Sequence, residues 1–318
     1  MTRIMTSRTV GRLGAKDAMA YSLQVTLDDA ADDGIWSVGW SSDGIIVTGG
    51  CDAIIRSFTV SGDALLRKSE FHGHCLAITS VSVNESMVAS SSLDSQVRIL
   101  DLNAGAEVRA FDAGPMEAWT VAVSQDGGTI ASGTQHGSVN IWSVTSGGLL
   151  QSLSTGTSAF VMSVACSPSN RHIACATAEG AIFLFDVERM ALVTQLNTHA
   201  ASVRALEFSS DGAFLASGSD DAYVNLYDVS AKGLALNAVL EGHRSWVLGL
   251  AFSPDGKLLA SCGADRSIRF WDLGTLASAQ TISDAHGDHV WSIAFDPRSG
   301  QRLASVGEDR RIKIWECL

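Results

Sequence analysis

The chain has 318 residues, of which 34 are acidic and 22 basic, and it carries a net charge of −12 at pH 7. Phosphate backbones are bound by clustered Lys and Arg. Here the basic side chains are few and scattered through the repeats, which argues against direct binding of RNA or DNA. No apolar run approaches the ~18 residues that a membrane-spanning helix needs, so we expect a soluble protein without membrane contact.

Residues 1–19 differ in composition from the rest. Four basic side chains precede the first acidic one, Asp17, and these are Arg3, Arg8, Arg12 and Lys16. An Arg-rich, acid-poor start is also typical of mitochondrial transit peptides, but no clean amphipathic period accompanies it. We therefore expect a disordered basic arm, or an upstream start ahead of Met19, rather than a targeting segment.

From residue 21 onward the chain repeats itself seven times. The units end on a bulky apolar residue every 42 to 44 positions, at Phe58, Leu100, Trp142, Phe185, Tyr227, Trp271 and Trp315. A polar residue stands six positions before each ending, namely Asp52, Asp94, His136, Glu179, Asp221, Asp265 and Asp309. A period of about 40 to 45 residues is typical of arrays whose units bury their apolar faces against one another. We interpret residues 20–318 as one repeat domain.

The sixth unit shows the strand pattern within a repeat. Residues 247–252 are apolar enough to be buried on both faces, and Ser253-Pro254-Asp255-Gly256 then supplies a hairpin turn. Strands over 258–262 and 267–271 follow, and a looser fourth strand fits before the next unit. Four antiparallel strands in each of seven units predict an all-β fold, a seven-bladed β-propeller.

Closure of the ring is also predicted. The chain ends three residues after Trp315, so the last unit lacks an outer strand. Residues 21–27 (YSLQVTL) have the pattern of a strand without earlier partners in their own unit. A ring leaves no gap if this N-terminal strand completes the last blade.

Gly73-His74, Gly242-His243 and the ending Trp271-Asp272 resemble the WD-repeat family, and the resemblance covers the chain from about residue 21. It implies a hydrogen-bonded chain of His, Ser, turn Asp and terminal Trp in each blade. The full sets are His243, Ser261, Asp265, Trp271 and His286, Ser305, Asp309, Trp315; His199, Ser217, Asp221, Tyr227 is nearly complete, and His74, Ser90, Asp94 lacks the aromatic end. Units one, three and four carry Ala31, Gly114 and Thr157 instead of the His, and we expect them to hold by packing alone and to be softer.

No enzyme is expected. Ser261, His243 and Asp265 are the residue types of a hydrolase triad, but the trio recurs at matching offsets in other units, whereas an active site is built once. The His72-x-His74 and His286-x-x-His289 spacings lack a third ligand, and no phosphate-binding glycine motif is present, so we expect neither a metal nor a cofactor. The six cysteines form no C-x-x-C pair, which favours a reducing compartment, cytoplasm or nucleus.

Large apolar residues gather at the start of the innermost strands. Trp36, Trp119 and Trp291 follow the first buried strand residue and Trp246 precedes one, while Phe160 and Met162 hold this place in unit four. In the resembling family this end opens on the narrow face around the channel, which commonly binds peptides. Charged residues fall beside it, namely Glu117, Arg204, Asp220 and Glu308. Aromatic faces next to carboxylates suit a partner's Arg, and we predict a protein-binding site from these ten residues.

Several non-consensus stretches carry a closer resemblance, at residues 32–38, 89–94, 112–120, 139–141 and 305–309. They look like the WD-repeat subunits of the superkiller (Ski) complex. The resemblance implies a non-catalytic adaptor, which a tetratricopeptide scaffold holds beside an RNA helicase in exosome-mediated mRNA decay. From its acidic surface we expect the chain alone to be a monomer. In animals and plants it also implies the RNA polymerase II-associated factor complex, and at the narrow face a partner motif Gln-Arg-x-x-apolar. The alternatives are another WD-repeat adaptor, such as a ubiquitin-ligase substrate receptor or a histone reader, and more remotely a propeller enzyme.

Overall fold

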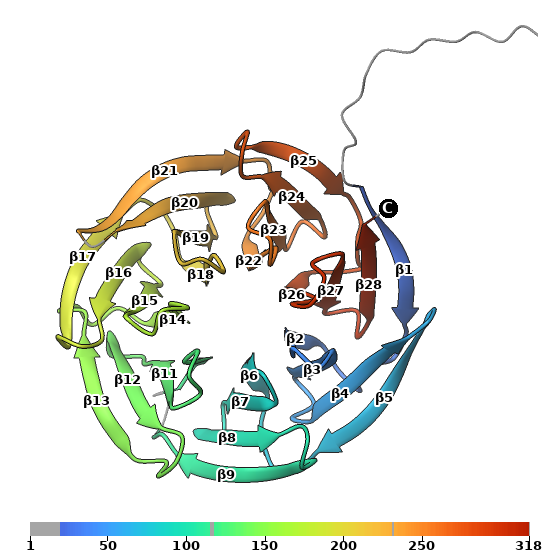
Figure 1. Ribbon diagram of the computed structural model, residues 1–318, viewed down its shortest axis with the longest axis horizontal. Helices are drawn as coiled ribbons and strands as arrows, with labels where there is room; N and C mark the ends of the chain where they lie inside the picture. Colours follow the sequence, from blue (N-terminus) through green and yellow to red (C-terminus); the bar gives the residue numbers. More distant parts are fainter. Residues whose placement is uncertain (1–19, 115–117, 231, 318) are drawn as a thin grey trace, which may run out of the picture.

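The computed structural model describes residues 20–114, 118–230 and 232–317, which form seven four-stranded antiparallel sheets. Residues 1–19 and Glu117, both named above, lie outside the described residues. The sheets are arranged as blades around a central axis, with the first strand of each blade innermost (Figure 1). The fold predicted from the sequence, a seven-bladed β-propeller, is confirmed.

Strands follow chain order from the axis outward in the first six blades. Blade 1 holds β2 (Ile35–Trp40), β3 (Ile45–Gly50), β4 (Ile55–Ser61) and β5 (Ala64–Phe71), and blade 2 holds β6 (Ile78–Asn84), β7 (Met87–Ser92), β8 (Gln96–Asp101) and β9 (Ala106–Asp112). Blade 3 holds β10 (Thr120–Val123), β11 (Thr129–Gly133), β12 (Ser138–Ser143) and β13 (Leu149–Ser154), and blade 4 holds β14 (Val161–Cys166), β15 (His172–Thr177), β16 (Ala181–Asp186) and β17 (Ala191–Asn197).

Blade 5 holds β18 (Val203–Phe208), β19 (Phe214–Ser219), β20 (Tyr223–Ser230) and β21 (Gly233–Glu241), and blade 6 holds β22 (Val247–Phe252), β23 (Leu258–Gly263), β24 (Ile268–Asp272) and β25 (Ala277–Ile282). Blade 7 holds β26 (Val290–Phe295), β27 (Arg302–Gly307), β28 (Ile312–Cys317) and, as its outer strand, β1 (Tyr21–Leu27).

Apolar faces are buried between neighbouring blades rather than within one blade. Strand β22 is buried at every position, whereas the outer strand β25 is mostly exposed. Trp271, at the end of the sixth repeat, is only 2% exposed and packs in a cluster that includes Val224 and Leu226 of blade 5. This arrangement is the reason why one repeat cannot fold alone.

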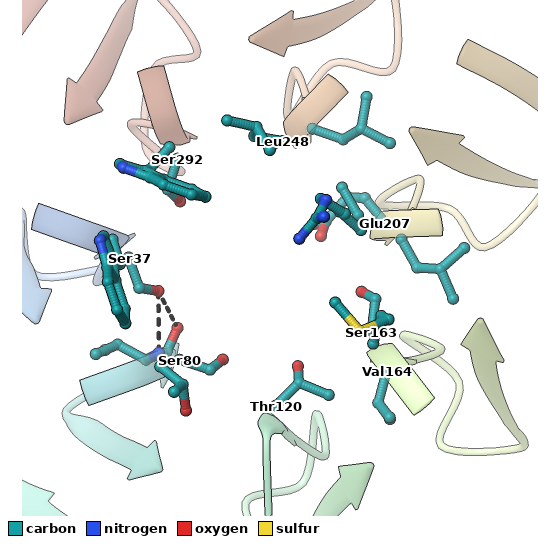
Figure 2. A pocket seen from close by; sticks show the side chains of 18 of the residues that line it. Ser37, Ser80, Thr120, Ser163, Val164, Glu207, Leu248 and Ser292 are labelled. Atoms are coloured by element: carbon teal, nitrogen blue, oxygen red, sulfur yellow. Dashed lines mark hydrogen bonds between the residues drawn. The ribbon is translucent and has the colours of Figure 1, made fainter. Parts of the chain in front are cut away.

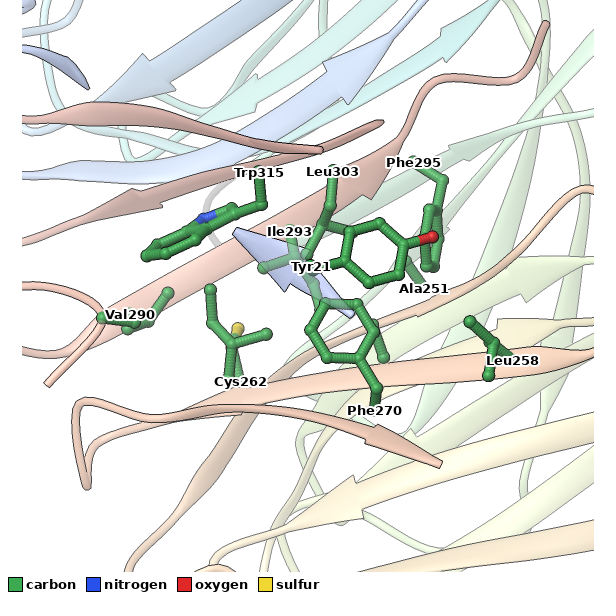
Figure 3. Packing of buried hydrophobic residues seen from close by; sticks show 13 residues of the cluster. Tyr21, Ala251, Leu258, Cys262, Phe270, Val290, Ile293, Phe295, Leu303 and Trp315 are labelled. Carbon is green, nitrogen blue, oxygen red and sulfur yellow. The ribbon is translucent and has the colours of Figure 1, made fainter. Parts of the chain in front are cut away.

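The N-terminal strand closes the ring, as predicted from the sequence. Strand β1 pairs antiparallel with β28 from Tyr21 opposite Cys317 to Leu27 opposite Ile312. Tyr21 reaches into the space between blades 6 and 7, where its ring stacks on Phe270 with centroids 4.3 Å apart (Figure 3). Its hydroxyl donates to the carbonyl of Gly300 at 2.8 Å. The first and last segments of the chain are therefore joined by both backbone pairing and core packing.

A hydrogen-bonded chain braces blade 6. The indole of Trp271 donates to Ser261 Oγ at 2.9 Å, Ser261 Oγ lies 2.8 Å from His243 Nε2, and His243 Nδ1 lies 3.0 Å from Asp265. One neutral tautomer satisfies every atom, because Nδ1–H donates to the carboxylate while Nε2 accepts the serine proton. Although burial alone would raise the pKa of Asp265, its hydrogen bonds from His243, Arg244 and Ser267 hold it well below the usual range.

Blades 7 and 5 carry the same chain, and blade 2 carries it without the aromatic end. In blade 7 the contacts join His286 to Asp309 (2.9 Å) and Ser305 (2.7 Å), and Trp315 to Ser305 (2.8 Å). In blade 5 they join His199 to Asp221 (2.9 Å) and Ser217 (2.7 Å), with Tyr227 as the aromatic end (3.2 Å). In blade 2 they join His74 to Asp94 (3.0 Å) and Ser90 (2.9 Å).

The expectation that blades 1, 3 and 4 hold by packing alone is wrong for two of them. In blade 1 the guanidinium of Arg56, which is 3% exposed, pairs with Asp52 at 2.5 Å and with Glu70 at 3.0 Å. A buried arginine therefore takes the place of the imidazole and satisfies the same turn acid. In blade 3, Trp142 still donates to Ser132 Oγ at 2.9 Å.

Candidate functional site

The innermost strands surround a channel that contains two cavities. The rim cavity, about 390 Å³, lies at the start of these strands and is lined among others by Trp36, Trp119 and Trp291 (Figure 2). The base cavity, about 680 Å³, lies at their ends, where Trp40, Phe208 and Phe295 contribute to its wall. The two cavities share one level of lining residues, Val38, Val81, Val121, Val164, Glu207, Leu250 and Ile293, so the channel is continuous in its lining from one to the other.

β-Bulges bring side chains to the rim. In six innermost strands the pairing register slips by one residue near the start, and the extra residue lines the rim cavity; these residues are Trp36, Thr79, Met162, Arg204, Leu248 and Trp291. A bulge re-aims the side chain of its extra residue and frees it from strict alternation. The rim can therefore vary chemically between blades while the buried strand positions remain apolar.

Hydroxyl groups line the wall just below the rim (Figure 2). Ser37 Oγ accepts the backbone N–H of Val81 at 3.0 Å, and Ser292 Oγ accepts that of Val38 at 3.3 Å. Each hydroxyl thus joins its own innermost strand to that of the next blade. From blade 7 to blade 2 these bonds fix the spacing of neighbouring innermost strands.

Blades 7 and 1 present a pair of indoles held by one carboxylate. Trp291 Nε1 donates to Glu308 Oε2 at 2.6 Å and Trp36 Nε1 approaches the same oxygen at 3.4 Å, while the two rings lie 5.9 Å apart. Gly34 permits this arrangement, because a Cβ there would lie 2.6 Å from Glu308 Oε2. With both N–H groups satisfied, the half-buried ring faces remain available as apolar platforms.

The electrostatic environment of this pair is negative. The pKa of the nearby Cys51 is raised to about 11. Burial is the largest cause, and the negative charges of Asp33, Glu308 and Asp52 add to it. Asp33 is exposed and Asp52 is already paired with Arg56. A cationic group brought to this part of the rim would meet uncompensated carboxylate charge and two aromatic faces, which is a favourable setting for cation–π contact.

Two further aromatic groups complete the rim. Trp119 and Phe160 of the neighbouring blades 3 and 4 meet edge to face with centroids 5.4 Å apart. Trp246 is 45% exposed, and the guanidinium of Arg204 lies 5.0 Å from the centre of its ring. Arg204 also forms two hydrogen bonds with Asp220, at 2.6 and 2.9 Å. Arg204 and Asp220 therefore neutralise each other, and the sequence alone did not indicate this pairing.

The structure brings eight of the ten predicted binding residues together at the rim in three groups, and a ninth, Met162, lines the rim cavity, while Glu117 lies outside the described residues. Sequence reasoning missed Thr79, Leu248 and Glu207, which line the same cavity. Aligning the seven innermost strands by their buried residues would have found them, because the positions correspond from blade to blade.

Across residues 20–114, 118–230 and 232–317, no group of three or more His, Cys, Asp or Glu side chains could hold a metal ion. Within the same part of the chain, no helix is long and apolar enough to cross a membrane.

The fold is a seven-bladed propeller, and partly exposed aromatic side chains surround the opening of its channel. The chain belongs to the WD-repeat family: the profile described as WD domain, G-beta repeat, matches residues 22–58, 66–101, 108–143, 147–186, 190–228, 235–272 and 278–316. Members of this family are typically non-catalytic scaffolds that bind other proteins.

Three relatives illustrate the similarity. WD repeat-containing protein SL1-17 of Schistosoma mansoni is 33% identical over 216 residues, which cover 66% of this chain and 71% of the relative. WD repeat-containing protein VIP3 of Arabidopsis thaliana is 35% identical over 204 residues, 58% of this chain and 63% of the relative. The meiotic recombination protein rec14 of Schizosaccharomyces pombe is 31% identical over 115 residues, 36% of this chain and 38% of the relative.

Proposed function

We propose that this protein is a non-catalytic adaptor subunit whose channel rim binds a short segment of a partner protein. The observation that carries the proposal is the rim itself. Three aromatic groups surround a cavity of about 390 Å³, and the most exposed indole, Trp246, is 45% exposed. Exposed aromatic side chains that sit in well-packed settings are typical of interaction hot spots.

The partner segment we propose has the form Gln-Arg-x-x-apolar, the partner motif that the resemblance to the WD-repeat subunits of the Ski complex implies for the narrow face. Its arginine would lie over the indoles of Trp36 and Trp291 and hydrogen-bond to Glu308, whose Oε1 has no hydrogen-bond partner among the described residues. Its apolar residue would pack against Trp119 and Phe160. The partners would then be a tetratricopeptide scaffold and a helicase-containing complex that supports exosome-mediated mRNA decay, with the polymerase-associated factor complex as a second assembly.

A co-purification experiment tests the partners. The tagged protein is isolated from its own cells beside the double variant Trp119→Ala, Trp291→Ala, and the bound proteins are identified. The control variant is Leu66→Ala, Leu150→Ala, which removes two exposed apolar side chains from the outer strands β5 and β13. We expect a tetratricopeptide protein and an RNA helicase with wild type and control, and neither with the rim variant.

A binding titration tests the motif separately. We expect a synthetic Gln-Arg-Ala-Ala-Leu peptide to lose ~30-fold or more in affinity for the rim variant, since truncating a hot-spot residue costs about 2 kcal/mol or more. Melting temperatures within a few degrees of wild type would show that the variant is folded. If a cullin adaptor or a histone tail is bound instead and the rim variant retains it, the proposed function is wrong.

A further inference from the structure

One channel residue differs from its counterparts in all other blades. Glu207 of β18 lines both cavities, and the corresponding residues of the other innermost strands that line the base cavity are Gly39, Ser82, Ala122, Ala165, Ala251 and Ala294. Figure 2 shows Glu207 among the side chains that surround the channel. It lies three residues beyond Arg204, roughly 10 Å along the strand. At this position of the seven innermost strands, six side chains are small and one is long and acidic.

The carboxylate of Glu207 has no compensating partner. Among the described residues, no hydrogen bond or ion pair to its side chain is present, and the residue is exposed where it lines the channel. Arg204 is the other charged residue in the described lining, and it is bound to Asp220 and lies over Trp246. Cys166 of β14 is a titratable residue of the base cavity, and burial raises its pKa to about 12, so it stays neutral.

Glu207 is exposed to the channel, and desolvation by the surrounding wall raises its pKa to about 7. In the narrow channel, where protein displaces part of the surrounding water, an ionised carboxylate is stabilised by a cation beside it. An unpaired one therefore gains free energy from any cationic group that can reach it. The lining shared by the two cavities next to Glu207 is apolar, with Val121, Val164 and Leu250 among its residues.

These features together specify the occupant. A ligand must have an apolar stem for the valine and leucine wall and a positive tip for the carboxylate, which is the form of a lysine side chain. A guanidinium fits less well, because its five N–H donors need acceptors, and the counterparts of Glu207 in the adjoining blades are Ala165 and Ala251, which offer no side-chain acceptor. We propose that Glu207 binds the ammonium group of a lysine side chain that a partner segment, docked on the rim, inserts into the channel. This inference rests on the proposed function, since the rim must hold that segment.

The first test uses n-butylammonium as a probe of the lysine side chain. The carboxyl carbons of all glutamates are labelled with ¹³C, and the Glu207 signal is assigned by its absence from Glu207→Gln. At pH 8 and constant ionic strength we expect a saturable shift of this signal with n-butylammonium, at least tenfold weaker binding of n-propylguanidinium, and no response to n-butanol. A shift that sodium or potassium chloride reproduces, or equal binding of the guanidinium, contradicts the proposal.

The second test separates this site from the rim. The variant Trp119→Ala, Trp291→Ala should still bind n-butylammonium, because neither residue touches Glu207's strand through any hydrogen bond or ring contact present among the described residues. If the probe fails while the rim variant loses its partner, the lysine site is wrong and the proposed function stands. If the probe binds but Glu207→Gln leaves the affinity for the co-purified partner within twofold, the site does not serve that partner and the proposal is also wrong.

The partner's affinity supplies a pH signature. Lysine binds the ionised carboxylate, and a group with a pKa of about 7 is ionised to roughly one tenth at pH 6 and nine tenths at pH 8. We expect the part of the affinity that depends on Glu207 to rise roughly tenfold over this range. In Glu207→Gln this rise should be absent.

Discussion

One backbone position is left-handed in every blade, and the chain accommodates it in two ways, with a preceding aspartate or with glycine. The residue after the turn acid has a positive φ between 61° and 87° in all seven blades, at Ala53, Ser95, Gly137, Gly180, Ala222, Arg266 and Arg310. Where aspartate precedes it, the carboxylate accepts a backbone N–H two residues on, as Asp265 does from Ser267 at 3.1 Å. Where His136 or Glu179 replaces the aspartate, the strained residue is glycine. The local hydrogen bond and the glycine are alternative ways to hold a left-handed turn.

This strain predicts a stabilising substitution. Ala222→Gly should raise the free energy of unfolding by about 1 kcal/mol, because an L-residue with Cβ costs 1–2 kcal/mol in the left-handed region and Ala222 has φ 71°. Denaturant unfolding measures the change. The control is Ala213→Gly in the same blade, an exposed turn residue that is not among the positive-φ residues, where glycine should destabilise. A loss of stability at Ala222 would show that the aspartate turn already removes the strain.

At the scale of elements, the stability of the ring depends on the strand that closes it, β1. Tyr21 is 4% exposed and Val25 5%, and β1 pairs with β28 along its length. Without β1, the edge of β28 and the cluster around Phe270 would be open to water. We expect deletion of residues 1–27 to lower the melting temperature by ten degrees or more or to prevent folding. Deletion of residues 1–18 keeps β1 and should change it little; equal effects of the two deletions would contradict the closing role of β1.

How far the sequence predicts an element depends on how strongly that element is buried. The expected strands 247–252 and 258–262 match β22 and β23 to within one residue, because buried apolar runs and tight turns mark both ends. The outer strand β25 could be placed only loosely, since its mostly exposed side chains need no particular pattern. Element order and ring closure followed from the repeat and from the unpaired strand at residues 21–27.

The site was less predictable, because its contacts join residues far apart in the chain. The register of the innermost strands predicts the positions of Trp36 and Trp291. It does not predict that Glu308 bridges their indoles across the junction of blades 7 and 1. The ion pair of Arg204 with Asp220 depends on a β-bulge between Val203 and Ala205 that no turn residue announces. Such contacts are set by the three-dimensional spacing of blades rather than by local sequence.

For the whole molecule, buried titratable groups set how stability depends on pH. Burial is the main cause that lowers the pKa of His74, His199 and His286 below the ordinary 6.5. Below pH 6.5 the unfolded chain binds protons at these positions that the folded chain does not, so stability falls as the pH is lowered. Glu207 acts in the opposite direction, because its pKa is raised from 4.5 to about 7 in the folded protein. Between these pH values the folded chain binds more protons at this residue than the unfolded chain, so the free energy of unfolding falls as the pH rises.

The two effects can be separated with one variant. Glu207→Gln should leave the melting temperature unchanged at pH 5, where the folded carboxyl is protonated, and raise it at pH 8, where wild type holds an unpaired charge in the channel. Channel water screens that charge, so we discount the full pKa shift to roughly 1 kcal/mol, or about 2 °C. The exposed Glu188→Gln serves as control and should show no such difference between the two pH values. The fall below pH 6.5 should persist in both variants, because it belongs to the histidines that brace the blades. If Glu207→Gln instead lowers the melting temperature at pH 8, the carboxylate is stabilised in the fold and is not available to a cationic partner.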